Sequence, residues 1–464
     1  LGRSSVEPFL TLSQRRDLRE KIWRAWTARG ETGGTTDNRA LAIETLRLRD
    51  EQARLLGYES FADFRLADSM AKTPDAAQDL LDRVWMPARA LALREEAALQ
   101  EAVAKEGANF TLAPWDWRYY AEKRRKSDFD LDESEIKPYL QLDKMIEAAF
   151  FTAEKLFGLS FRERPDLPLY HPDARAFEVT GADGAPVALF IGDYYARPSK
   201  HGGAWMSEYC EQQRLDGAVL PIIVNIMNFV KPPAGEACLL SFDDARTLFH
   251  EFGHALHGLL SDVTYPLLSG TNVVRDFVEF PSQLFEHWLE QKEILRSFAL
   301  HYHAHQPMPD VLIEKIRAAR QFNQGFATVE YTASALVDLA LHKERPSKDL
   351  DIVARENDLL AKLGMPKSIV MRHRTPHFTH VFSGDSYAAG YYSYLWSEVL
   401  DADGFEAFVE AGDIFDPGVA KRLREHVYAA GNKTDAQKAY LAFRGHAPAP
   451  EPLLKKRGLA GQEV

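Results

Sequence analysis

Apolar residues recur at intervals of three and four over most of the chain, which is the period of an amphipathic helix. Several of these stretches stop at a glycine, the residue that commonly follows the last turn of a helix. Thr73 and Pro74 provide an N-cap and a first-turn proline at the start of the longest stretch. Helices are therefore expected over residues 12–29, 38–56, 74–106 and 141–157, and again from 309 onward.

The pattern changes between residues 170 and 230, where β-branched and aromatic residues gather in short runs. Residues 177–179 and 187–191 flank an Asp183-Gly184 turn, which predicts a β-hairpin. A further strand is expected over 220–229. The hydrophobic pattern thus predicts a mainly α fold with a small β-sheet at about 170–230.

One amphipathic stretch also carries residues that bind metal ions. Its apolar side is formed by Leu248, Phe249, Phe252, Ala255, Leu256 and Leu259. His250 and His254 lie about one helical turn apart, so both imidazoles can face one ion. Zinc accepts histidine nitrogen and carboxylate oxygen, and a catalytic site keeps one position for water. In such an HExxH site Glu251 is the general base that deprotonates the water. The carboxylates of Asp243 and Asp244 lie near the expected helix start, where negative charge interacts favourably with the helix dipole.

A catalytic zinc site needs a third protein ligand. The next helical stretch, residues 273–291, offers three, which the residues alone do not distinguish: Glu279, Glu286 and His287. Asp276 and Gln283 share a helical face with Glu279, so either could accept an N–H from a ligand histidine.

The segment HEFGHALH at 250–257, followed by SGTNVVRDFVEFPSQLFEHW at 269–288, resembles the thimet-oligopeptidase family of zinc metallopeptidases, and most of all its peptidyl-dipeptidase branch. PWDWRYY at 114–120 extends the resemblance upstream of the metal motif. The resemblance implies a zincin-type catalytic core in a two-lobed helical protein that contains a channel. It also implies one Zn²⁺ per chain and selects Glu279 as the third metal ligand.

Residues 373–396 form a second cluster with possible chemistry. Tyr387, Tyr391 and Tyr394 recur at spacings of four and three, which places them on one helical face if the helix begins early enough. Peptide hydrolysis needs hydrogen-bond donors at the developing oxyanion, and tyrosine O–H and histidine N–H can serve. The resemblance implies that His380 and the tyrosines do so, with Tyr394 at the oxyanion and Tyr387 and Tyr391 against the substrate.

The spacing leaves His373 and His377 open as alternatives to His380. By resemblance the substrates are short oligopeptides, from which the peptidyl-dipeptidase branch releases dipeptides at a free C-terminus. That reaction requires a cation for the terminal carboxylate and a loop over the cleft. The candidates are Arg275, Arg372 and Arg374 for the cation and residues 269–271, with Gly270, for a flexible substrate-binding loop. An endo-oligopeptidase and an inactive peptide-binding fragment are the alternatives.

Composition restricts the partners and the setting. The 464 residues carry a net charge of −12, which argues against nucleic acid and anionic membranes as partners. The two cysteines, Cys210 and Cys238, indicate free thiols in a reducing compartment, so a cytoplasmic location is expected. The sequence contains no run of eighteen or more apolar residues, so no membrane span is expected.

The expected organisation is a helical lobe over 1–128 and a zinc catalytic lobe over 129–464. The chain begins without Met and enters a helical pattern at once, whereas the resembling family carries a further helical region upstream. We therefore expect that lobe to be incomplete. Apolar surface left exposed would be covered by a separate N-terminal fragment or by a second copy of the chain.

Overall fold

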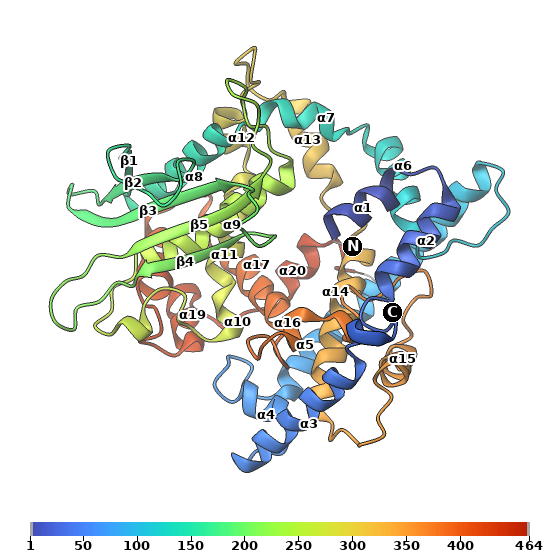
Figure 1. Cartoon of the computed structure of the whole chain (residues 1–464). Helices are drawn as coiled ribbons and strands as arrows, with labels where there is room; N and C mark the ends of the chain where they lie inside the picture. The colour runs from blue at the N-terminus through green and yellow to red at the C-terminus, as the bar shows by residue number, and fades with distance from the viewer. Residues whose placement is uncertain (1–2, 462–464) are drawn as a thin grey trace. The chain divides into compact units, whose positions relative to one another are not determined.

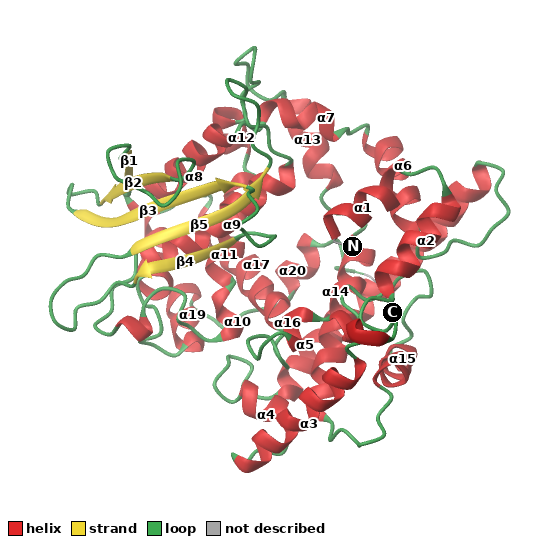
Figure 2. Cartoon of the chain, viewed as in Figure 1, coloured by secondary structure: helices red, strands yellow, loops and turns green. Residues whose placement is uncertain are grey.

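Helices dominate the computed structural model, which describes residues 3–461, and one five-stranded sheet accompanies them (Figures 1 and 2). This architecture confirms the predicted mainly α fold with a small sheet. The helices are α1 (Arg3–Leu12), α2 (Arg16–Thr27), α3 (Arg39–Leu55), α4 (Phe61–Leu66), α5 (Pro74–Lys105), α6 (Trp117–Phe129), α7 (Glu133–Ile136), α8 (Leu142–Phe157), α9 (Phe242–Leu259), α10 (Arg275–Val278), α11 (Phe280–Leu289), α12 (Lys292–Phe298), α13 (Asp310–Ala319), α14 (Gln324–Lys343), α15 (Ile352–Lys362), α16 (Thr379–Phe382), α17 (Ser393–Ala411), α18 (Pro417–Leu423), α19 (Ala436–Arg444) and α20 (Glu451–Lys456).

Local signals placed several helix ends correctly. Thr73 caps α5 by accepting the N–H of Ala76, and Gly158 ends α8 in the left-handed conformation. The expected helix over 12–29 is α2, which begins only at Arg16, and α1 precedes it over Arg3–Leu12, where no helix was predicted. The N–H of Arg15 donates to Ser13 Oγ, and this local side-chain bond favours a turn between them.

The sheet comprises β1 (Ser160–Glu163), β2 (Arg175–Thr180), β3 (Pro186–Tyr195), β4 (Trp205–Cys210) and β5 (Ile222–Phe229), in the order β1-β2-β3-β5-β4. β3 and β5 are parallel, and all other neighbours are antiparallel. The predicted hairpin is β2–β3 and the predicted third strand is β5. The sequence did not predict β1 and β4, the two edge strands, because neither has the alternating apolar pattern of a half-buried strand.

Aromatic packing joins the sheet to α8 and α9. Phe252 of α9 contacts Phe150 of α8, Phe161 of β1 and Phe190 of β3, with ring centroids 5.4–5.6 Å apart. Each buried phenylalanine stabilises the fold by about 1.5–3 kcal/mol. The side of α9 opposite its polar residues is therefore fixed against the sheet.

The chain folds into two compact units. Unit 1 comprises Leu1–Asp130, Ala318–Trp396 and Leu454–Val464, and unit 2 comprises Leu131–Arg317 and Ser397–Leu453. This grouping differs from the sequence-based boundary at residue 128. The reason is that α14 packs along α5, where Glu95 accepts the N–H groups of Gly325 and Phe326. Such long-range pairing leaves no signal in the local hydrophobic pattern.

Candidate active site

A capping box fixes the start of α9, the helix that carries the HExxH motif. Ser241 Oγ accepts the N–H of Asp244, and the Asp244 carboxylate accepts the N–H of Ser241, both at 3.0 Å. Two unpaired N–H groups are thereby satisfied, and the negative charge of Asp244 lies at the positive end of the helix dipole. The acidic residues at this helix start were expected from the sequence, whereas the serine cap was not.

Gly253 lets α9 and α11 approach closely. A Cβ at this position would lie 2.6 Å from Ser282 Cα and 2.8 Å from the carbonyl oxygen of Pro281, distances that folded proteins do not tolerate. The glycine inside the HEFGH motif therefore sets the distance between the two helices. This contact brings the start of α11 beside the two histidines, more than twenty residues earlier in the chain.

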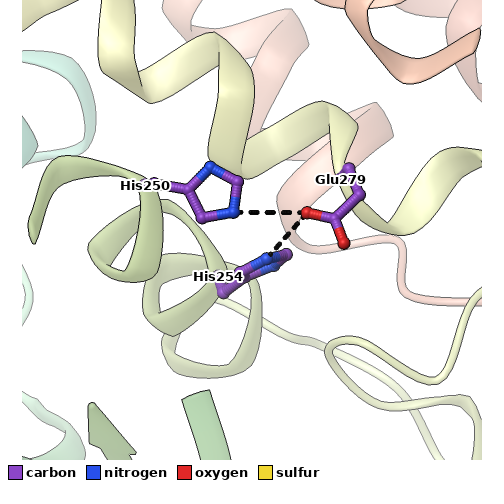
Figure 3. Close-up of side chains that lie close together, drawn as sticks. All are labelled: His250, His254 and Glu279. Carbon is purple, nitrogen blue, oxygen red and sulfur yellow. Dashed lines mark ion pairs between the residues drawn. The ribbon is translucent and has the colours of Figure 1, made fainter. Parts of the chain in front are cut away.

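His250, His254 and Glu279 form one convergent group within unit 2 (Figure 3). The Nε2 atoms of His250 and His254 each lie 3.2 Å from Oε2 of Glu279. Glu279 occupies the junction between α10 and α11, not the middle of one continuous helix over 273–291 as predicted. Pro281, next to this junction, favours the first turn of a new helix.

Glu286 is the hydrogen-bond partner of His250, not a further member of the group. Its Oε1 lies 2.7 Å from Nδ1 of His250, which fixes the proton on that nitrogen and leaves Nε2 to face Glu279. From the sequence, Asp276 and Gln283 were the candidates for this role, and Glu286 was a candidate metal ligand. The missed signal is its spacing of seven residues from Glu279, two helical turns along the same side.

Burial and mutual attraction shape the charges of the group. Burial alone would raise the pKa of Glu279, but hydrogen bonds from His250 and His254 lower it well below its usual range. Burial would likewise lower the pKa of His250, but its hydrogen bonds with Glu279 and Glu286 raise it well above the usual value. The ionised carboxylate of Glu279 and the imidazoles of His250 and His254 thus converge on one point.

Glu251 is buried beside this group, with 6% of its surface exposed. Burial raises the pKa of its carboxyl above the usual value, and the charge of Glu279 acts in the same direction. A carboxylate with a raised pKa is a better proton acceptor for water than an ordinary surface glutamate.

The donor set fits a divalent metal ion. Two imidazole nitrogens and one carboxylate oxygen all lie within 4.8 Å of one another, the arrangement that an ion at their centre would require. Within residues 3–461, no other group of histidine, cysteine and acidic side chains has ligand atoms that converge in this way. Two histidines and a glutamate suit zinc in a site that retains water.

The family model of peptidase family M3 matches residues 9–459. The chain belongs to peptidase family M3. The M3 chain is 42% identical to dipeptidyl carboxypeptidase of Escherichia coli over 98% of its own length and 67% of that protein. It is 34% identical to oligopeptidase A of Escherichia coli, covering 98% of this chain and 68% of the relative.

A solved structure of a Pyrococcus furiosus carboxypeptidase superimposes with a TM-score of 0.52 at 15% identity, covering 98% of this chain and 80% of that one. This likeness concerns the fold alone. The family membership shows that the M3 chain is a metallopeptidase, and it implies a divalent metal.

The second predicted cluster of the M3 chain forms within unit 1. The Tyr387 and Tyr394 rings stack with centroids 5.2 Å apart, and the Tyr391 ring lies 5.6 Å from that of Tyr394. The predicted helical face does not explain this arrangement, because α17 begins only at Ser393. Turns over 385–392 bring the three rings together instead.

His380 and His373 both belong to this cluster. Their ring centroids are 4.8 Å apart, and those of His380 and Tyr391 are 5.5 Å apart. His377 points toward Arg29, which lies 3.4 Å from its Nδ1. Burial, followed by the charges of His380 and Arg372, lowers the pKa of His373 to about 3, and burial also lowers the pKa of His380. Both imidazoles are therefore neutral near pH 7.

Burial raises the pKa of Tyr391 to about 12, so its hydroxyl keeps its proton. The cluster therefore presents neutral N–H and O–H groups, the kind of donor that stabilises an oxyanion.

The proposed carboxylate-binding arginines differ in how far their charge is already compensated. Arg374 forms ion pairs with Glu356 at 2.8 Å and Glu31 at 2.6 Å, and little of it is exposed. The Arg372 side chain is 40% exposed, and its ion pair with Glu330 spans 3.7 Å. Arg275 begins α10, next to the metal-binding segment.

The segment around Gly270 is buried in unit 2. Ser269 and Gly270 both bond to Ser261, whose Oγ accepts the N–H of Gly270 at 3.1 Å. A Cβ at Gly270 would meet Glu208, so the chain is closely packed at this point. These contacts hold the segment in place and do not support the flexible loop that the sequence led us to expect.

Proposed function

We propose that the M3 chain hydrolyses short oligopeptides with one Zn²⁺ held by His250, His254 and Glu279, and releases dipeptides from the C-terminus. The observation that carries this proposal is the convergence of three ligand atoms beside the buried carboxylate of Glu251. The name of the Escherichia coli relative, dipeptidyl carboxypeptidase, supports the cleavage pattern.

Zinc bound at this site would polarise the peptide carbonyl and lower the pKa of water. Glu251 accepts the proton of the attacking water and delivers it to the leaving amine, as a buried base with a raised pKa can do. Tyr394 and His380 are the proposed donors to the oxyanion, and Tyr387 and Tyr391 the proposed substrate contacts. These roles rest on the resemblance and on the neutral state of the cluster.

Strand β4 is the proposed docking edge for the substrate backbone. It is the edge strand beside β5, and it packs against α9, where Glu208 approaches Gly258. An extended peptide can add to such an edge through main-chain hydrogen bonds, independently of its side chains. Binding of this kind suits an enzyme that accepts varied oligopeptides.

Arg275, Arg372 and Arg374 remain the candidates for the substrate's terminal carboxylate, with Gly270 as a proposed contact. The contacts favour Arg372 over Arg374, because two carboxylates already neutralise Arg374. An exposed guanidinium can bind a carboxylate in a bidentate manner without breaking a buried ion pair.

Paired peptides test the proposed function directly. A peptide of six residues and its C-terminally amidated twin are incubated with the zinc-loaded protein, and the products are identified by mass spectrometry. The expected result is stepwise loss of dipeptides from the free-acid peptide and strongly reduced cleavage of the amide. Equal rates would favour an endo-oligopeptidase, and no cleavage of either peptide would favour an inactive peptide-binding protein.

We further propose that a second copy of the chain, or a separate N-terminal fragment, covers an apolar stripe on α3. Leu41, Leu48 and Leu55 repeat every seven residues, and 66%, 57% and 80% of their surfaces are exposed. A heptad of exposed leucines is typical of a helix that packs against another helix. Light scattering of the native protein tests this, and a monomer at all concentrations would contradict the second-copy form.

The proposed location is a reducing compartment such as the cytoplasm, which the free thiols of Cys210 and Cys238 support. Within residues 3–461, every helix is too short or too polar to span a lipid bilayer. The absence of nucleic-acid partners stays a prediction from the net charge.

A further inference from the structure

Helix α14 carries a polar stripe although most of its surface is buried. Tyr331, Ser334 and Asp338 follow one another at spacings of three and four, which places them on one side of the helix. Ser334 and Asp338 are almost completely buried. Buried polar groups in folded proteins are nearly always hydrogen-bonded, so the hydrogen-bond partners of this stripe show which part of the chain it holds.

Asp338 binds the backbone of the turn that carries the tyrosines. Its Oδ1 accepts the N–H of Ala389 and its Oδ2 accepts the N–H of Tyr391, both at 3.0 Å. Ala389 is buried and has a φ of 55°, a left-handed conformation that a residue with a Cβ adopts only when its surroundings impose it. The Asp338 carboxylate helps to impose this conformation, because its two oxygens bind the backbone N–H groups on either side of Gly390.

Tyr331 and Ser334 hold the neighbouring backbone in the same way. The Tyr331 hydroxyl donates to the carbonyl of Tyr391 and accepts the N–H of Leu395 at 3.2 Å. Ser334 Oγ accepts the N–H of His373 at 3.0 Å. The stripe thus binds the main chain on both sides of the histidine–tyrosine cluster.

Further side chains surround Asp338 and the turn. Arg49 Nη1 lies 3.1 Å from Nε2 of His342, and because a guanidinium only donates, this nitrogen accepts. The imidazole proton is therefore on Nδ1, which donates to the backbone carbonyl of Asp338 at 2.8 Å and lies 3.0 Å from its Oδ1. Arg49 also donates to the carboxylate of Asp385, where the turn begins.

We propose that Tyr331, Ser334 and Asp338 form a positioning device for the histidine–tyrosine cluster, with Asp338 as its principal residue. These side chains act through the backbone of the segments that carry the cluster, and so determine where its donors point. The inference rests on the proposed function of that cluster, because it assigns the device a role in turnover. A displacement of about 1 Å in a catalytic group can cost about 100-fold in rate.

Asp338→Asn tests the device with little change in volume. The amide keeps one acceptor oxygen but turns an NH₂ group toward the other backbone N–H. Glu95→Gln is the matched control, because Glu95 also accepts two backbone N–H groups in unit 1, those of Gly325 and Phe326. In the zinc-loaded protein we expect Asp338→Asn to lower kcat by about 100-fold with KM little changed, and Glu95→Gln to leave both unchanged.

A double variant separates positioning from general damage. If Asp338 acts through the cluster, Asp338→Asn lowers kcat much less in a Tyr394→Phe background than in the parent. Parental kcat in Asp338→Asn, or an undiminished loss in the double variant, would overturn the proposal. Should Asp338→Asn fail to fold, Tyr331→Phe removes a single hydroxyl and is compared in the same way.

Amide hydrogen exchange provides a readout that does not depend on peptidase activity. We expect peptides that cover residues 385–392 to exchange faster in Asp338→Asn and at the parental rate in Glu95→Gln. Unchanged exchange would show that Asp338 does not hold this segment, even if the parent cleaves no peptide. Inactivity of the parent would instead reject the proposed function.

Discussion

Nδ1 of His250 and a carboxylate oxygen of Glu286 lie 2.7 Å apart. This contact orients the imidazole so that Nε2 points at Glu279. Carboxylates that bond to a ligand histidine fix its ring orientation and tautomer, and their loss commonly weakens metal binding. The pair therefore explains how one histidine is held ready for an ion, and it leads to the first prediction.

Glu286→Ala is expected to weaken zinc binding by about 10–100-fold, because the His250 ring loses its orienting partner. Competition with a chromophoric chelator measures the affinity. Glu293→Ala removes an exposed carboxylate from the neighbouring helix α12 and is expected to bind zinc as the parent does. Parental affinity in Glu286→Ala would show that the contact does not serve the metal.

Glu251→Gln is expected to retain one zinc per chain and to lower kcat by about 10²–10⁴-fold, since the amide cannot accept the proton of the attacking water. Metal analysis and peptide hydrolysis are measured on the same preparation. Asp243→Asn, an exposed change on the same helix, serves as the control. A Glu251→Gln protein that cleaves peptides at the parental rate would remove Glu251 from the role of base.

Glu208 is expected to make stability depend on pH. Burial, followed by the charge of Glu211, raises the pKa of this carboxyl from 4.5 to about 7. The folded state then binds more protons than the unfolded state between these values, so stability falls as pH rises from about 4.5 to about 7. Glu208→Gln removes this titration, and it should reduce the difference in Tm between pH 5 and pH 8.

The exposed Glu236→Gln change controls for the loss of one surface charge and should leave that difference as in the parent. An unaltered pH dependence in Glu208→Gln would mean that Glu208 titrates alike in both states.

Gly253→Ala is expected to destabilise the fold by about 1–3 kcal/mol, because the new methyl group overlaps the backbone at Ser282. Zinc affinity should fall as well, since α11 and Glu279 would move away from the histidines. Denaturant unfolding and a chelator titration measure the two effects. Gly202→Ala, where a Cβ meets no atom within 4 Å, should alter neither. A fully stable Gly253→Ala protein with parental affinity would contradict the role given to this contact.

The sequence by itself determined those features that depend on neighbours within a few residues. The two histidines on α9, the Thr73 cap of α5 and the Asp183-Gly184 turn of the β2–β3 hairpin all follow from local hydrogen bonding and helical period. Resemblance, not spacing, selected Glu279 from among the possible third ligands. The polar stripe on α14, formed by Tyr331, Ser334 and Asp338 within an apolar run, was not predicted, because local rules do not say what such residues bind.

Only the tertiary structure decided which residues separated in the chain come into contact. It placed Glu279 beside both histidines and made Glu286 the hydrogen-bond partner of His250, although both acids lie on the same side of one helical region. It also gathered the tyrosines through a turn instead of a helix, with Ala389 held in a left-handed conformation. The physical reason is that helix packing and buried hydrogen bonds join segments whose mutual register is set by side-chain shape across the core, as at Gly253, and this information is spread over the whole chain.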